Sequence, residues 1–235
     1  MKKIYYITAV FATLFLVGCG DGIDLPGVNV ETDLNKIPLP DNNVNLEQVE
    51  LKPSTEPMLH EGLHTEEDFQ RIRDKKAAGE EPWVSAYQLL VESQFSQKTA
   101  DTYPTEWIKR GISGDENYMN AARGATIVYQ QALRWKIEQD DEYAAKAVEN
   151  LNKWVQTCVG VTGNTNLSLA AGLYGYEFAI AGELLRDYGG WDRADFAAFQ
   201  NWLLKVFYPA NDDFLKRHHD TNALHYWANW CLCNI

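Results

Sequence analysis

Residues 217–230, near the end of the printed sequence, hold the densest group of side chains suited to acid–base chemistry. On a helix that begins near Asn222, His225 follows after three residues and Asn229 after four more, so the three share one helical face. The aromatic residues beside that face are Tyr226, Trp227 and Trp230. Polar groups on a buried aromatic helix need hydrogen-bond partners, which the protein or a ligand can supply. The spacing alone is more typical of a hydrogen-bonded core histidine, and a substrate-binding histidine is the alternative.

Two other catalytic arrangements fit this region poorly. His218, His219 and His225 are candidate metal ligands, but neighbouring histidines point in different directions on a helix. The cluster contains no HExxH motif, and the chain has no Gly-x-Ser-x-Gly elbow for a serine nucleophile. We therefore expect neither a metal ion nor another cofactor.

Two further clusters have a structural and a functional interpretation. Residues 163–176 suit a capped, closely packed helix start, and the functional interpretation places Asn166 at the mouth of a pocket. Residues 103–111 combine Tyr103 and Trp107 with the basic pair Lys109 and Arg110. They suit an ordered loop with a solvated basic pair, or an aromatic and cationic wall, including Arg110, for an anionic sugar.

Helices are the elements predicted to position these groups. Thr65 and Asp68 form a variant capping box before a helix that ends near Gly79. Later helices are expected to begin near Pro82, Ser113 or Asp115, Asp140, Asn166 or Ser168, and Asp192, with shorter pieces over 212–218 and 222–235. Residues 97–112 are expected to be a loop, Pro209 is expected to close a helix, and no strand is predicted. The pattern predicts an all-α fold, an incomplete (α/α) toroid of antiparallel helix hairpins.

The last predicted helix runs apolar and aromatic to Ile235 without a Gly, Pro or basic closing turn. The predicted helices also make fewer hairpins than a closed toroid contains. We therefore expect the chain to be the N-terminal part of a larger domain, truncated at its C-terminus. A complete small helical domain is the alternative.

The N-terminus has the pattern of an export signal. Lys2 and Lys3 precede an apolar run over 4–17 that is too short to span a bilayer. The run ends Leu-Val-Gly-Cys, which resembles a bacterial lipobox and predicts lipidation of Cys19. We expect a signal peptide over 1–18, a proline-rich tether over 19–58 and a helical domain over 59–235. The protein is thus predicted to be lipid-anchored in a bacterial envelope, at the outer membrane or facing the periplasm.

Composition narrows the classes of function. The chain is 46% hydrophobic and 23% charged, which is typical of a globular protein. The net charge is −12, and removal of residues 1–18 shifts it to −14 because two lysines are lost. Such a balance argues against nucleic-acid binding, which needs a basic face. We expect contact with a membrane only through the lipid anchor.

From about His60 onward, the chain resembles bacterial polysaccharide lyases of the alginate-lyase kind. The segments that carry the resemblance are residues 62–73, 82–83, 123–125, 166–175, 181–188 and 225–230. The resemblance implies an α/α toroid, often incomplete, that holds an anionic polysaccharide or oligosaccharide in a central cleft. It also implies β-elimination of a uronate polymer such as alginate or glucuronan, without a metal.

The same resemblance assigns roles to residues. His225 matches the catalytic histidine of the related motif, with Tyr226, Trp227 and Arg110 expected at the substrate. Ala223 and Leu224 stand where the motif has asparagine, so Asn222, Asn229 or Asn166 is expected to neutralise the sugar carboxylate. The catalytic tyrosine and its supporting arginine lie further downstream in related lyases, past Ile235, so a fragment that is inactive by itself is the alternative expectation.

Two other functions fit the same features. A glycan-binding envelope lipoprotein would use the Trp and Tyr side chains as stacking platforms without catalysis. A glycoside hydrolase on the same scaffold would need two carboxylates beside the scissile bond, and Glu177, Glu183 and Asp220 are the candidates.

Overall fold

The computed structural model of the protein describes residues 63–164 and 166–217. Several predicted features lie outside these residues: the signal peptide over 1–18, the lipidation site Cys19, the tether over 19–58, and the helical face of Asn222, His225 and Asn229. We call that face the stripe around His225. The described elements are α3 (Glu66–Ala77), α4 (Trp83–Glu92), the 3₁₀ helix η2 (Gln94–Ser96), β1 (Trp107–Arg110), α5 (Tyr118–Glu138), α6 (Asp141–Thr157), β2 (Gly160–Gly163), α7 (Asn166–Leu185), α8 (Arg193–Val206) and α9 (Tyr208–Arg217). The prediction of an all-α fold is confirmed for this part of the chain.

Side-chain caps set several of the helix starts where the sequence predicts them. Thr65 Oγ1 accepts from the backbone N–H of Asp68, and Asp68 Oδ2 accepts from that of Thr65, which completes the capping box of α3. Asp140 and Asp192 accept from backbone N–H groups in the first turns of α6 and α8. These caps satisfy N–H groups that have no partner within the helix.

Two predicted helix boundaries are wrong. Helix α5 begins at Tyr118, later than Ser113 or Asp115, because the Asn117 side chain is bonded to β1. Asn117 accepts from the N–H of Lys109 at 2.7 Å and donates to the carbonyl of Trp107 at 2.9 Å. Pro209 does not close a helix: α8 has already ended, and Pro209 lies in the first turn of α9, where its missing N–H is not needed.

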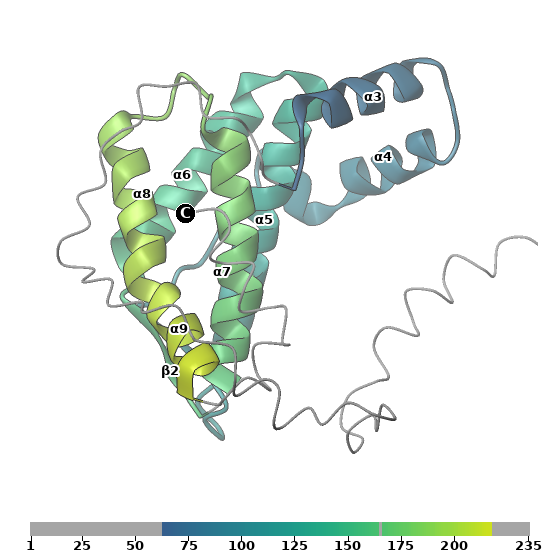
Figure 1. The fold of residues 1–235 in the computed structure, drawn as a ribbon. Helices are drawn as coiled ribbons and strands as arrows, with labels where there is room; N and C mark the ends of the chain where they lie inside the picture. Colours follow the sequence, from purple (N-terminus) through teal and green to yellow (C-terminus); the bar gives the residue numbers. More distant parts are fainter. Residues whose placement is uncertain (1–62, 165, 218–235) are drawn as a thin grey trace, which may run out of the picture. The chain divides into compact units, whose positions relative to one another are not determined.

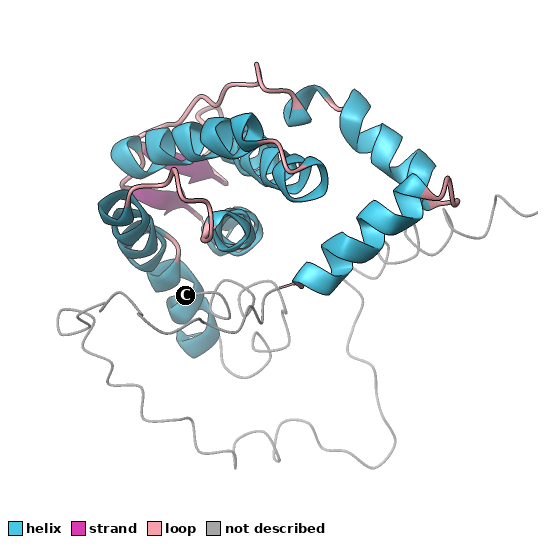
Figure 2. Ribbon diagram, turned by 90° about the horizontal axis from the view of Figure 1, so that it is seen from above, coloured by secondary structure: helices cyan, strands magenta, loops and turns pink. Residues whose placement is uncertain are grey.

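The helices form hairpins that stack on one another. Helix α5 packs on α6 and on α7, while α6 packs on α8, so the α5–α6 and α7–α8 hairpins lie side by side. Figures 1 and 2 show α3 and α4 to one side of these helices. The closure of such hairpins into a toroid stays a prediction. Within the described residues, no helix is both long and apolar enough to cross a membrane.

An aromatic cluster joins the helices, and small residues allow the close approach. The buried ring of Phe178 on α7 lies 5.5 Å from that of Trp154 on α6 and 5.2 Å from that of Trp202 on α8. A Cβ at Gly182 would lie 2.2 Å from the ring of Phe199, so the α7–α8 contact requires glycine there. The predicted role of the small residues in α7 as a close-packing face is therefore confirmed at Gly182.

The expectation that the chain has no strand is wrong. Residues 107–110 pair in parallel with 160–163, and Arg110 lies opposite Gly163. The strands are short, and each contains too few residues to show a lasting alternation of apolar and polar side chains. Because β2 comes just before α7 in the chain and both strands contact α7, the pair places β1 beside α7.

Candidate active site

The site is built where β1 ends and α7 begins. Gly163 has φ +146°, and a Cβ there would lie 1.7 Å from the carbonyl oxygen of Arg110. Gly111 has φ +78°, and a Cβ there would lie 1.9 Å from Oδ1 of Asn164. Both positions need glycine, for conformation and for space. The two glycines therefore allow the chain at Arg110 and Gly111 to lie close to Gly163 and Asn164, which come just before α7.

The Arg110 side chain meets two tyrosines from different helices. Its Nη1 donates to Oη of Tyr174 on α7 at 3.0 Å, and its Cζ lies 4.5 Å from the ring centroid of Tyr118 on α5. The two tyrosine rings are parallel within 6°, with centroids 6.5 Å apart. The guanidinium is thus held by a hydrogen bond and a cation–π contact.

No carboxylate in the described part of the chain forms an ion pair with Arg110, so its positive charge is available to a ligand. Burial raises the pKa of Tyr174, and the Arg110 charge opposes this rise only in part. Tyr174 therefore keeps its proton at neutral pH. Since Arg110 donates to Oη, the tyrosine O–H remains able to donate to a bound molecule. An unpaired guanidinium beside such a donor suits a carboxylate.

A protonatable carboxyl lies further along α7. Burial raises the pKa of Glu177 to about 7, while a hydrogen bond with Thr126 of α5 acts in the opposite direction. Glu177 lies one helical turn after Tyr174 and raises the pKa of that tyrosine. The carboxyl is thus half-ionised near neutral pH and can serve as an acid or as a base.

A tyrosine–histidine pair lies further along α5. Nε2 of His64 is 2.6 Å from Oη of Tyr129. Burial lowers the pKa of His64 and raises that of Tyr129 to about 12, so both are neutral at neutral pH. Neutral His64 then accepts from the tyrosine O–H. His64 also borders a cavity of about 210 Å³ between α3 and the end of α7.

Hydrogen bonds, ring contacts and charge interactions link these groups in one series where α5 packs on α7. We call this series of residues the polar strip. Its members are Arg110, Tyr118, Tyr174, Glu177, Thr126, Tyr129 and His64. The strip was only partly predictable. Tyr118 and Tyr129 recur at the spacing of a buried helix face, which indicates core packing, and nothing in the sequence shows that Arg110 reaches them. The parallel pairing of β1 with β2 is the missing information.

The predicted site residues are distributed as follows. Asn166 is exposed at the start of α7, and its backbone N–H donates to Oδ1 of Asn164 at 2.9 Å, so it lies at the same end of α7 as Arg110. Lys109 is paired with Asp115 at 2.7 Å and does not join the strip. The remaining candidates, Asn222, His225, Tyr226, Trp227 and Asn229, lie outside the described residues.

Two alternative chemistries can be compared with the structure. Residues 60–64 match the HExxH pattern, which binds zinc when both histidines lie on one helix. Helix α3 begins only at Glu66, and His64 is engaged by Tyr129, so His64 is not placed for that role. For a hydrolase, Glu183 is paired with Arg186, which leaves Glu177 as the protonatable carboxyl on the described part of α7.

The fold and the strip together define an all-α hairpin protein in which Arg110 lies against Tyr118 and Tyr174 and forms no ion pair with any described residue. The chain belongs to the alginate lyase family, whose model matches residues 72–235. Comparisons with curated proteins and with solved structures gave no match. The matched region includes Arg110, Tyr174, Glu177 and the stripe around His225.

Proposed function

We propose that the protein cleaves a uronate polymer, of the alginate or glucuronan type, by β-elimination. The observation that carries this proposal is the Arg110 guanidinium, which has no acidic partner among the described residues and lies against Tyr118 and Tyr174. Family membership supports a polysaccharide lyase in general. The substrate class and the roles of residues are our inference from the site.

The reaction requires a neutralised carboxylate. The C5 proton of a uronate is weakly acidic until the adjacent carboxylate charge is balanced, which Arg110 achieves by a charge-assisted hydrogen bond. A base then removes the C5 proton, the electron pair forms the C4–C5 double bond, and the C4–O4 bond breaks. O4 leaves with a proton. Tyr174 is protonated at neutral pH and suits the donor, and His225 is our candidate for the base.

The acidic character of the chain makes the local charge important. A polyanion approaching a protein of net charge −12 is repelled at long range, so binding depends on cations that have no internal partner. In the described part of the chain, Arg110 and Arg123 are two basic side chains without an ion pair, whereas Lys109 is neutralised by Asp115. Because dissolved ions screen charges, added salt is expected to weaken the long-range repulsion between the protein and the polyanion.

The test compares Arg110→Gln with Lys109→Gln on alginate, glucuronan and a neutral glucan. Elimination is read from the ultraviolet absorbance of the new double bond, and hydrolysis from reducing ends without that absorbance. We expect Arg110→Gln to lower kcat/KM roughly 10- to 100-fold on the uronate polymer, the size of one charged hydrogen bond. Lys109→Gln removes the same charge from the same strand and is expected to have little effect.

Other outcomes identify the alternatives. Reducing ends without absorbance indicate a glycoside hydrolase. Saturable binding of the polymer without any product indicates a glycan-binding protein. Equal losses in both variants show that charge alone matters, which contradicts a specific role for Arg110.

We further propose that Cys19 carries a lipid that anchors the protein in the envelope. The support is the lipobox pattern that ends at Cys19. Replacement of Cys19 with Ser is expected to release the protein from the membrane fraction. Retention of the variant in that fraction contradicts the anchor.

A further inference from the structure

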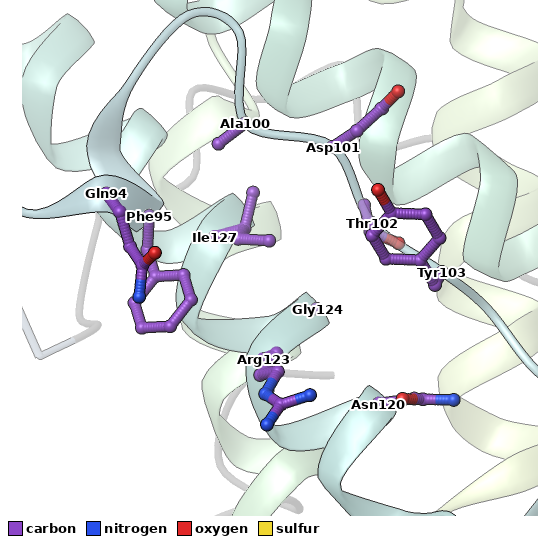
Figure 3. A pocket seen from close by; sticks show the side chains of 10 residues that line it. All are labelled: Gln94, Phe95, Ala100, Asp101, Thr102, Tyr103, Asn120, Arg123, Gly124 and Ile127. Atoms are coloured by element: carbon purple, nitrogen blue, oxygen red, sulfur yellow. The ribbon is translucent and has the colours of Figure 1, made fainter.

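We propose a second carbohydrate site, which binds one uronate unit in a cavity between α5 and the loop before β1. The cavity has a volume of about 220 Å³. Figure 3 shows its lining: Gln94 and Phe95 on one side, the loop residues Ala100 to Tyr103 on another, and Asn120, Arg123, Gly124 and Ile127 of α5. The substrate class rests on the proposed function, because the cavity itself specifies only an acidic, hydroxyl-bearing ligand.

The cavity lies on a different face of α5 from the polar strip. Arg123 follows Tyr118 by five residues, which is about 140° around the helix axis, and Ile127 follows by nine, about 180°. Tyr118 faces Arg110, whereas Arg123 and Ile127 face the loop. A ligand in the cavity therefore does not occupy the Arg110 site.

The charge at the cavity favours a carboxylate. The charged residues that line it are Asp101 and Arg123. Asp101 forms ion pairs with Lys146 and Lys153, which lower its pKa. Asp101 therefore stays ionised, and the two lysines balance its negative charge. Arg123 is exposed and forms no ion pair within the described residues. An acidic sugar thus meets one uncompensated positive charge.

The remaining lining suits the body of a sugar. Tyr103 is 76% exposed beside the cavity and its ring offers a flat apolar face, while Gln94 and Asn120 offer amide donors and acceptors. Among the described residues, the hydroxyl of Thr102 has no hydrogen-bond partner, although Thr102 is only 5% exposed. Unpartnered buried donors call for a ligand or a water molecule.

A buried amide pair holds the loop in place. Asn150 accepts from the N–H of Thr102 at 3.3 Å and donates to the carbonyl of Ala100 at 3.0 Å. It also donates to Oε1 of Gln131, and Gln131 donates to the same Ala100 carbonyl at 3.1 Å. Both side chains are fully buried, so the loop is fixed before any ligand binds. Such preorganisation reduces the entropy cost of binding.

The experiment is a nuclear magnetic resonance titration of the Ile127 methyl group with D-glucuronate and with D-glucose. We expect saturable shifts with glucuronate and none with glucose. The shifts should disappear in Arg123→Gln, weaken several-fold in Tyr103→Ala and persist in Arg110→Gln. Arg193→Gln removes the same charge from α8 and is expected to bind normally. The variants should fold, because the side chains they change all lie at least partly at the surface: Tyr103, Arg110, Arg123 and Arg193.

The outcomes separate this proposal from the proposed function. Absence of Ile127 shifts, equal shifts with glucose, or shifts that survive Arg123→Gln would overturn the second site, even if the polymer is cleaved at Arg110. Ile127 shifts lost in Arg123→Gln together with no cleavage of any uronate polymer would overturn only the proposed lyase function.

Discussion

Arg110 donates a 3.0 Å hydrogen bond to the hydroxyl of Tyr174, which joins the end of β1 to the first half of α7. The bond depends on the backbone, because the parallel β1–β2 pair sets where Arg110 lies relative to α7. A change in the strand ends should therefore disturb the site without touching either side chain.

Gly163→Ala tests this dependence. The new Cβ would lie 1.7 Å from the Arg110 carbonyl, at a φ that L-residues rarely adopt. We expect a loss of stability of about 2 kcal/mol or more, together with weaker uronate binding. Gly114→Ala is the control, since Gly114 has φ +78° but open space around its Cβ position. Chemical denaturation and titration with a uronate oligosaccharide measure the two effects. Equal stability losses in both variants would show that strain alone acts.

Glu177→Gln should change the pH dependence of stability. Burial raises the pKa of Glu177 from 4.5 to about 7, so the folded protein binds an extra proton between these values. Stability contributed by the protonated form is complete below pH 4.5 and is lost as the pH rises to 7. The variant should equal the wild type near pH 4 and exceed it at pH 8, by on the order of 1–3 kcal/mol. Urea unfolding across this range measures the difference.

Glu149→Gln is the matched control for that experiment. Hydrogen bonds from Lys153 and Lys146 lower the pKa of Glu149, so its contribution is present above its unfolded pKa and lost as the pH falls. The variant should lose a little stability at neutral pH and none in acid. A similar pH profile for both variants would contradict the assignment of a raised pKa to Glu177.

Gly182→Ala tests the close contact between α7 and α8. Alanine is normally better than glycine inside a helix by about 1 kcal/mol. Here the Cβ would lie 2.2 Å from the ring of Phe199, which is 3% exposed and packed against Trp191 and Trp202. We expect a net loss of about 1–3 kcal/mol and a lower Tm. Gly189→Ala, with open space at its Cβ position, should be neutral or stabilising. A stabilising Gly182→Ala would disprove the contact.

His225→Ala tests the stripe that sequence analysis singled out. A catalytic histidine predicts a loss of turnover of order 10²-fold or more with little change in Tm. A core histidine predicts the reverse, a loss of about 1–3 kcal/mol in stability with turnover per folded molecule retained. Turnover and thermal unfolding measured on one preparation separate the two. Retained turnover would leave Asn166 and Arg110 as the candidates for carboxylate binding.

The helices were predictable because their signals are local. Thr65, Asp140 and Asp192 cap their helices where their residue types predict, and Gly182 gives the close approach expected of a small residue. The strands and the site were not predictable, because they depend on contacts between distant segments. Arg110 was a candidate from its residue type, but its partner Tyr174 looked like a packing residue. Glu177 appeared only as a possible hydrolase carboxylate, since burial, which raises its pKa, is a property of the folded chain.

The pairing of Ile108 with Val161 also constrains the order of folding. The entire α5–α6 hairpin lies between these partners, so pairing of the strands has a larger loop-closure cost before the hairpin has formed. We therefore expect the contact of Arg110 with Tyr174 to form late in folding. A partly folded chain with intact helices would therefore lack this contact, and binding at Arg110 would report that folding is complete.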